Sequence, residues 1–151
     1  TNRMNPAQEH FLSEMFKQKV YSEIDSIKKS NRKSSNWLLF LPPEEYHEIG
    51  LLFSRFLLIQ NGFDVIYLGA NVPLSALKQV SQTKKIDNLL FFSISNFSKI
   101  NLIDTIISLD KYFKNTKQYL VNSSINPNRL LPKSKITLIQ SFDQFIKLIS
   151  N

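Results

Sequence analysis

The sequence predicts an α/β fold with a doubly wound parallel sheet of five strands, and three observations lead to this prediction. Short apolar runs alternate along the chain with segments whose apolar residues recur at helical spacing. The apolar runs lack a regular polar alternation, which is typical of parallel strands that are covered on both faces. The chain has 151 residues, 42% of them hydrophobic, which suits one globular domain with a short appendage.

A helix is predicted at the start of the chain. Asn5 can cap it, and Pro6 suits its first turn. Apolar residues then repeat at helical spacing, and they are Phe11, Leu12, Met15, Phe16, Val20, Ile24 and Ile27. We expect residues 1–30 to be the terminal helix of a truncated helical bundle, 31–36 to be a polar linker, and 37–151 to be the α/β domain.

Within the α/β domain, strands and helices are predicted in strict alternation. The strands are expected at 37–41, 64–68, 88–95, 118–122 and 136–139. The helices are expected at 44–60, 73–84, 102–113 and 142–149, with a short irregular helix at 126–131. Asn61-Gly62 is a typical left-handed ending for the first of these helices. This order corresponds to the flavodoxin-like type of doubly wound sheet.

Composition narrows the possible functions. The chain has no cysteine, so disulfides, thiolate metal sites and cysteine nucleophiles are excluded from it. No signal peptide is visible, and the longest apolar run, 49–59, contains Arg55 and is too short to cross a bilayer. We therefore expect a cytoplasmic protein without a membrane partner. The net charge of +7 is interpreted as a lysine-rich solvated face, with a nucleic acid neighbour as the alternative.

Several enzyme classes have no sequence support. No glycine-rich dinucleotide or phosphate loop follows the first predicted strand, and no Gly-x-Ser-x-Gly elbow occurs. Asp64, Asp87 and Asp104 are scattered and do not indicate an acidic pocket. With two histidines and no cysteine, a zinc site has too few evident ligands. We expect that the protein is not an enzyme.

The strongest candidate site is the motif Glu45-Tyr46-His47-Glu48-Ile49-Gly50, a Glu-x-His-x-x-Gly pattern at a predicted strand-to-helix junction. Open parallel sheets bind ligands outside the carboxyl ends of their strands. An imidazole there, with a carboxylate two residues away, can bind a metal while the carboxylate orients the ring. The alternative interpretation places Glu44 and Glu45 in the first helical turn as partners of the helix dipole, and Gly50 in helix–sheet packing.

Several segments together resemble the cobalamin-binding domain. His47 occupies the position of the motif histidine, residues 67–73 (Tyr-Leu-Gly-Ala-Asn-Val-Pro) match the segment after the second strand, and Ser93-Ile94-Ser95 ends the third strand. Glu9-His10 is similar to the Glu-His pair in the helical bundle of light-sensing MerR-type transcriptional regulators. The resemblance covers most of the chain and implies a sheet of the cobalamin-binding type.

The resemblance also implies a cofactor, partners and site residues. The cofactor would be adenosylcobalamin or methylcobalamin, with His47 as the lower axial ligand of cobalt and His10 as an upper ligand after loss of the alkyl group. The implied cofactor-binding residues are Glu9, His10, Glu45, His47, Gly50, Gly69, Asn71, Val72, Pro73, Ser93, Ser95, Asn122, Ser123 and Ser124. The implied function is the sensory domain of a regulator that forms a homo-oligomer, responds to light and reaches DNA through an amino-terminal winged-helix domain.

Three departures from the family pattern leave two other functions open. Asn122-Ser123-Ser124 stands where the family has Gly-Gly beside the nucleotide tail of the cofactor, Ser95 replaces leucine, and Glu45 replaces aspartate. The first alternative is a degenerate, cofactor-free regulatory or oligomerisation domain. The second is the corrinoid carrier subunit of a methyltransferase or mutase, in which Glu9-His10 would be incidental.

Overall fold

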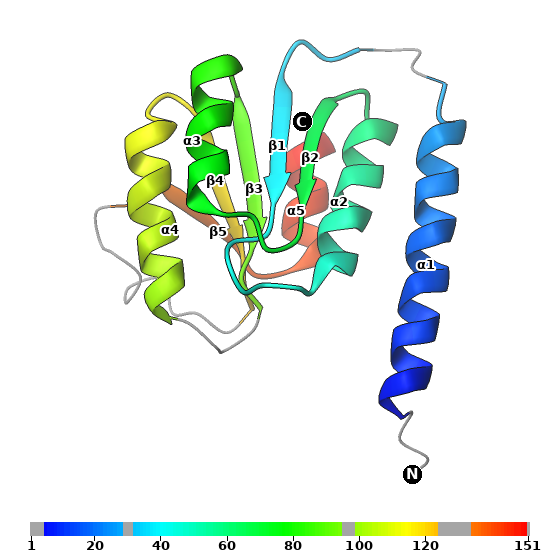
Figure 1. The fold of residues 1–151 in the computed structure, drawn as a ribbon. Coiled ribbons are helices and arrows are strands. Elements are labelled where there is room, and N and C mark those ends of the chain that lie inside the picture. Colours follow the sequence, from blue (N-terminus) through cyan, green and yellow to red (C-terminus); the bar gives the residue numbers. More distant parts are fainter. Residues whose placement is uncertain (1–4, 29–31, 95–98, 124–133, 151) are drawn as a thin grey trace.

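The computed structural model describes residues 5–28, 32–94, 99–123 and 134–150 (Figure 1). The elements are α1 (Pro6–Ser26), β1 (Asn36–Phe40), α2 (Glu48–Gln60), β2 (Asp64–Gly69), α3 (Leu74–Thr83), β3 (Asn88–Phe92), α4 (Lys99–Tyr112), β4 (Lys117–Val121), β5 (Ile136–Ile139) and α5 (Phe142–Ser150). All strand pairs are parallel and the order is β2-β1-β3-β4-β5, which confirms the predicted fold class.

Helices cover both faces of the sheet. In Figure 1, α2 and α5 lie on one face and α3 and α4 on the other, while α1 stands outside α2. Strand side chains alternate between these two layers, because successive residues of a strand point to opposite faces. Thus Trp37 and Leu39 of β1 belong to the core under α2 and α5, and Leu38 and Phe40 belong to the core under α3 and α4.

Both cores are built largely from aliphatic and aromatic side chains. Under α3 and α4, the rings of Phe40 and Phe91 stack with centroids 5.4 Å apart. Under α2 and α5, Trp37 stacks on Tyr119 at 5.4 Å and meets the edge of Phe63 at 5.8 Å. Burial of such rings is a main source of folding free energy. Because both faces of the sheet bury side chains in this way, the strands are apolar at successive positions and do not alternate with polar residues.

Helix α1 begins as predicted, and its first half lies beyond the rest of the domain while its second half packs against it (Figure 1). Its cap is reciprocal, because Asn5 accepts from the backbone N–H of Gln8 and the Gln8 side chain accepts from that of Asn5. Its second half is anchored on α2, where Val20 and Ile24 are buried with Leu52. Its first turns project beyond the carboxyl edge of the sheet (Figure 1). None of the described helices is both long and apolar enough to cross a membrane.

Some predicted boundaries were wrong. Helix α2 begins at Glu48 and not at residue 44, because Glu44 has a φ of 66° and the backbone N–H of Glu45 donates to the carbonyl of Pro42 in a turn. Strand β3 ends at Phe92, and β1 already includes Asn36. The helix predicted at 126–131 lies outside the described residues. Because α2 begins at Glu48, Glu44 and Glu45 are not in its first turn, and the interpretation of these two residues as partners of the helix dipole is wrong.

Candidate functional site

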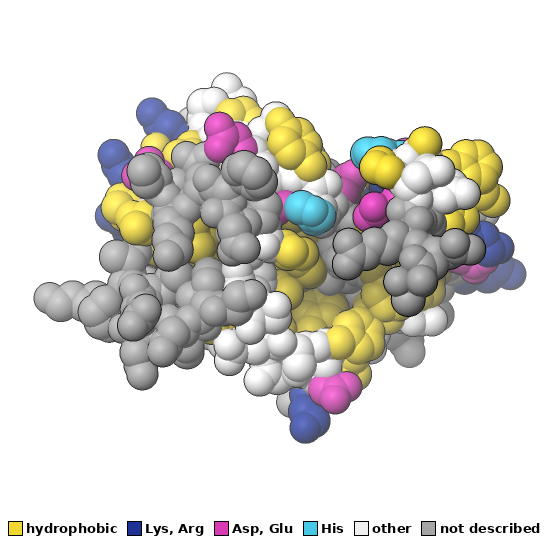
Figure 2. Space-filling model, turned by 90° about the horizontal axis from the view of Figure 1, so that it is seen from below, with side chains coloured by type: hydrophobic (Ala, Val, Ile, Leu, Met, Phe, Trp, Pro, Cys, Tyr) yellow, Lys and Arg dark blue, Asp and Glu magenta, His cyan; other side chains and the backbone are white. Residues whose placement is uncertain are grey.

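The candidate site lies where the sheet changes direction. From β1 the chain passes to β2 on one side and then crosses to β3 on the other, so the loops after β1 and β3 diverge at the carboxyl edge. Such a switch point is where open parallel sheets bind ligands. Figure 2 views this edge, and hydrophobic side chains line a hollow there beside histidine and acidic side chains.

Glu45 and His47 form a close pair in the loop after β1. Nδ1 of His47 lies 2.6 Å from Oε1 of Glu45. A carboxylate can only accept, so Nδ1 is the donor, and in the neutral imidazole Nε2 then keeps its lone pair. The side chain of Glu45 is 3% exposed and that of His47 is 62% exposed. The pair therefore presents an oriented imidazole to solvent from a buried support.

The Glu45 carboxylate also organises the surrounding backbone. Its Oε1 accepts from the backbone N–H groups of Tyr46 and His47 at 3.0 and 3.1 Å. Its Oε2 accepts from the N–H of Ile94, after β3, at 2.7 Å. Its own carbonyl accepts from the N–H of Asn71, after β2, at 3.1 Å. One residue thus joins the loops that follow β1, β2 and β3, which fixes the position of His47.

Backbone strain is concentrated in the same loops. Glu44 and Asn71 are the positive-φ residues other than glycine in the described chain, with φ of 66° and 54°. They are joined, since the N–H of Glu44 donates to Oδ1 of Asn71 at 3.0 Å. Gly69, with a φ of 79°, ends β2 and its carbonyl accepts from Leu41. Residues held in this region cost free energy and tend to occur where geometry serves a function.

Gly50 and Glu48 connect the site to the rest of the domain. A Cβ at Gly50 would lie 2.8 Å from Cε1 of Phe92, so glycine permits α2 to approach β3 closely. Oε1 of Glu48 accepts from the hydroxyl of Tyr67 at 2.8 Å, and Oε2 lies 3.7 Å from Nζ of Lys17 on α1. Burial, reinforced by this carboxylate, raises the pKa of Tyr67 well above its ordinary value.

The position of the expected Gly-Gly pair is occupied by a buried side chain. Asn122 follows β4, and its amide donates to the carbonyl of Ser93 after β3, while its N–H donates to Ile139. The amide thereby bridges two strand ends. Ser123 is exposed. Ser95 and Ser124, which were also predicted to contact the cofactor, lie outside the described residues.

The other predicted residues divide between scaffold and surface. Val72 is buried in the core and donates its N–H to Leu41, and Pro73 caps α3. Glu9 and His10 are exposed on the projecting turns of α1. Among the described contacts, no hydrogen bond or ion pair joins these two residues to Glu45 or His47. The structure therefore brings together the loops after β1, β2 and β3 and leaves His10 outside their hydrogen-bonded network.

Large apolar side chains are exposed at the carboxyl edge, close to His47 in the sequence or to Glu45 in the fold. Tyr46 and Ile49 flank His47 and are 65% and 39% exposed, and Ile94, next to Glu45, is 51% exposed. On the projecting turns of α1, Phe11 is 65% exposed. Large exposed apolar groups gathered at one place indicate a binding surface. In the described part of the chain, no three histidine or carboxylate side chains come together as a metal-binding cluster.

Sequence reasoning missed three contacts. The bond from Ile94 to Glu45 uses a backbone N–H, so no residue type could have signalled it. The Glu48–Tyr67 bond joins residues 19 positions apart on α2 and β2 and needs the fold to be seen. The bridge from Asn122 could have been suspected, because a polar residue at the end of an apolar strand needs a partner.

Comparison with known proteins gives structural matches only. No protein-family model matches the sequence, and no curated protein matches it. A novel cobalamin-binding protein from Desulfitobacterium hafniense DCB-2 is similar with a TM-score of 0.67 and 16% identity over 89% of this chain. The monomethylamine corrinoid protein of Methanosarcina barkeri gives 0.64 and 14% over 89%. A chain of that organism's methanol:cobalamin methyltransferase complex gives 0.63 and 15% over 84%.

These similarities establish the fold of the chain and not its activity. The chain covers 66%, 62% and 51% of the three matched chains, so the likeness concerns only part of each. The identities are too low to carry over any activity. The shared features are the parallel sheet in the order β2-β1-β3-β4-β5 and the amino-terminal helix. The chain therefore has the fold of cobalamin-binding domains.

Proposed function

We propose that this protein binds a cobalamin-type corrinoid at the carboxyl edge of its sheet, with His47 as the protein ligand of cobalt. The observation that carries the proposal is the Glu45–His47 pair. Its 2.6 Å contact orients the imidazole and leaves Nε2 available to a metal. The similarity of the fold to structures of cobalamin-binding and corrinoid proteins supports the choice of a corrinoid as the ligand.

The residues at this edge suit such a cofactor. An imidazole that donates through Nδ1 to a buried carboxylate is a stronger ligand through Nε2. The exposed side chains of Tyr46, Ile49 and Ile94 offer apolar contact to a broad macrocycle. When bound, the cofactor would supply reactive cobalt–carbon chemistry. The protein's contribution would be to hold His47 and to shield one face of the ring from water.

A spectrophotometric titration tests the proposal. The protein is titrated in the dark with adenosylcobalamin, alongside His47→Ala and His10→Ala. We expect a stoichiometric spectral change with the original protein and with His10→Ala, and loss of the histidine-ligated spectrum with His47→Ala. An absence of binding at high micromolar cofactor would contradict the proposal and would favour the degenerate, cofactor-free domain. The buried Asn122 amide, in place of the family's glycine, is the feature behind that alternative.

A sensory role is the finer form of the proposal. Here the domain would serve a MerR-type regulator, with DNA bound by a winged-helix domain ahead of this chain. Glu9-His10 supports it by resemblance, as does the projection of α1 past the carboxyl edge (Figure 1). A change of oligomeric state on green light, measured by gel filtration with cofactor bound, is the expected result. A light-independent oligomer would remove the sensory role but would leave cofactor binding intact.

A carrier role is the second candidate, and the structural comparisons favour it. Two of the similar structures are a monomethylamine corrinoid protein and a methanol:cobalamin methyltransferase complex. In this role the domain would present the cofactor to a partner enzyme, and His10 would be dispensable. Copurification of the cofactor-loaded protein with a methyltransferase, unchanged in His10→Ala, would support the carrier role over the sensory one.

A further inference from the structure

Basic side chains gather at the amino edge of the sheet, opposite the His47 site. We call the segments 27–28, 32–35, 61–64, 84–87, 113–117 and 134–135 the amino-edge surface. Its basic residues are Lys28, Arg32, Lys33, Lys84, Lys85, Lys114, Lys117 and Lys135, and its acidic residues are Asp64 and Asp87. The described loops of the carboxyl edge, 41–47, 70–73, 93–94, 122–123 and 140–141, contain no lysine or arginine. Among these described loops, the two edges therefore differ in the sign of their charge.

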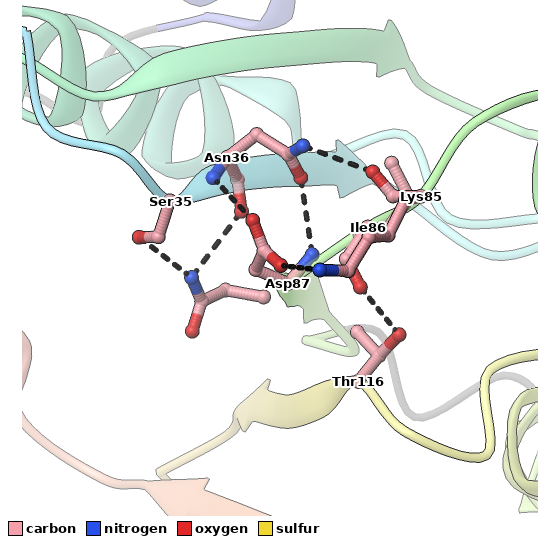
Figure 3. A network of polar contacts seen from close by, with 7 residues as sticks. Ser35, Asn36, Lys85, Ile86, Asp87 and Thr116 are labelled. Carbon is pink, nitrogen blue, oxygen red and sulfur yellow. Dashed lines mark hydrogen bonds and ion pairs between the residues drawn. The ribbon is translucent and has the colours of Figure 1, made fainter.

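Hydrogen bonds hold the amino-edge loops rigidly relative to one another (Figure 3). Asn36 and Asp87 exchange two bonds of 3.0 Å, from the N–H of each to a side-chain oxygen of the other. The Asn36 amide also donates to the carbonyl of Lys85 at 2.9 Å. The hydroxyl of Thr116 donates to the carbonyl of Ile86 at 2.7 Å. The starts of β1, β3 and β4 thus form one platform, which lowers the ordering cost of binding.

Most of these basic groups extend into solvent from that platform. Lys84, Lys114 and Lys117 are exposed and make no ion pair with a described residue. The Lys85 side chain is 91% exposed although its Nζ lies 3.7 Å from Asp87. Lys33 differs, since its Nζ donates to the carbonyl of Ile149 at 3.2 Å and lies over the Phe63 ring. The surface therefore carries several cations that are free to meet an external anion.

Helix dipoles explain only part of this charge. A helix C-terminus attracts cations, and four lysines of the amino-edge surface lie within two residues of one, namely Lys28, Lys84, Lys85 and Lys114. Lys117 begins β4, Lys135 directly precedes β5, and Arg32 lies four residues before β1, and none of the three is within two residues of a helix end. Basic residues in excess of those that the helix ends explain indicate an external partner of opposite charge.

We propose that the amino-edge surface binds the phosphate backbone of a nucleic acid without preference for base sequence. The cations before β1, β3, β4 and β5 span roughly 14 Å of sheet edge, at about 4.8 Å per strand. A duplex carries one charge per about 1.7 Å, so this span can meet several phosphates. Lysine acts as a point charge for phosphate, whereas arginine is favoured for reading base edges. No large apolar side chain of the described amino-edge surface is exposed, so an apolar membrane anchor is lacking there.

Fluorescence anisotropy with a labelled DNA duplex of mixed sequence tests this proposal. The dissociation constant is measured over a range of salt concentrations for the original protein and for the double variant Lys84→Gln, Lys117→Gln. The matched control is Lys78→Gln, Lys147→Gln, which removes the same charge from exposed sites on α3 and α5. We expect the salt dependence of log K to lose about one unit of slope per amino-edge lysine, and binding at moderate salt to weaken at least roughly tenfold. The control should leave the slope unchanged.

Three results would overturn the proposal. An equal loss in the control variant would mean that the attraction is diffuse. Binding to vesicles of anionic lipid without binding to the duplex would assign the surface to a membrane. Affinity confined to one base sequence would contradict backbone recognition. Circular dichroism should be the same for both double variants, and His47→Ala should bind DNA like the original protein, because the two edges act independently.

Discussion

At the carboxyl edge of the sheet a buried carboxylate, Glu45, ties three loops together, whereas at the amino edge the amide of Asn36 and the hydroxyl of Thr116 share that task with Asp87. The carboxyl edge also contains Glu44 and Asn71 at positive φ. In the described amino-edge loops, positive φ occurs at Gly62, where a glycine adopts it at little cost.

This difference between the two edges distinguishes the part of the sheet that supports the fold from the part that we propose binds a ligand. A buried charge and strained residues cost stability, so their presence at one edge indicates that the geometry there serves something other than folding. The amino edge satisfies its backbone groups mostly with the neutral side chains of Asn36 and Thr116, and Asp87, the carboxylate in this network, is 30% exposed and not fully buried like Glu45. We therefore expect mutations at the two edges to differ in their effects on the free energy of unfolding and on ligand binding.

The largest effect is expected for Glu45→Leu. This change leaves four donors without their acceptor, namely the N–H groups of Tyr46, His47 and Ile94 and Nδ1 of His47. We expect the free energy of unfolding to fall by about 3–5 kcal/mol in a urea titration. Asp104→Asn, an exposed carboxylate on α4, should change it by less than about 0.5 kcal/mol. A loss below about 1 kcal/mol for Glu45→Leu would show that the carboxylate does not hold the loops.

Gly50→Ala should have the next largest effect. The new Cβ would lie 2.8 Å from Cε1 of Phe92, so the ring or α2 must shift. Overpacking of this kind costs about 1–3 kcal/mol, measurable by thermal or urea unfolding. Ser108→Ala, a half-buried position of α4, provides a control for adding helix-favouring alanine. Unchanged stability together with weaker corrinoid binding would mean that Gly50 serves the ligand and not the packing.

Asn36→Ala tests the amino edge, and we expect it to lower the free energy of unfolding by less than the two preceding changes. It removes the bond to the carbonyl of Lys85 and leaves the N–H of Asp87 without its acceptor. The part-buried location limits the loss of unfolding free energy to about 1 kcal/mol. Cofactor binding should stay the same, because the opposite edge is untouched. A variant that loses cofactor affinity at unchanged stability would contradict the separation of the two edges.

The smallest expected effect is on the pH dependence of the free energy of unfolding. Burial, and then the Glu48 carboxylate, raise the pKa of Tyr67, so the native state keeps the phenol protonated where the unfolded chain ionises. This stabilisation is fully present below the ordinary tyrosine pKa of about 10 and is lost progressively above it. Tyr67→Phe should show a weaker fall in unfolding free energy as the pH rises past that value. Some fall should remain, since the pKa values of Tyr119 and Lys17 are also raised. An identical pH profile for both proteins would contradict the role of Tyr67.

The sequence was sufficient for the fold class because apolar strands and amphipathic helices alternate without interruption. The motif also predicted the contact between Glu45 and His47, since their two-residue spacing after a strand already suggested a supported imidazole. The start of α2 was mispredicted because acidic residues before an apolar run are typical of a first helical turn. Here Glu44 adopts a left-handed conformation, and its N–H donates to Asn71 of another loop.

The remaining features depend on tertiary contacts. Ile94 donates a backbone N–H to Glu45 from 49 positions away, and Asn122 reaches Ser93 across 29 positions. The sequence could suggest that Asn122 needs a partner, but no local pattern identifies Ser93 or Ile94 as the partner in either pairing. The same holds for the amino-edge surface, because its lysines are dispersed in the sequence and only the parallel sheet brings them to one side.

The central claim is that Nε2 of His47 binds the metal of a corrinoid. The most direct test is electron paramagnetic resonance of the cobalamin-loaded protein after one-electron reduction, with the protein's histidines labelled with the heavy nitrogen isotope. A histidine ligand should give a nitrogen splitting that changes from a triplet to a doublet on labelling, and the change should persist in His10→Ala but vanish in His47→Ala. A splitting that is insensitive to the label would assign the nitrogen to the cofactor's own base and contradict the claim.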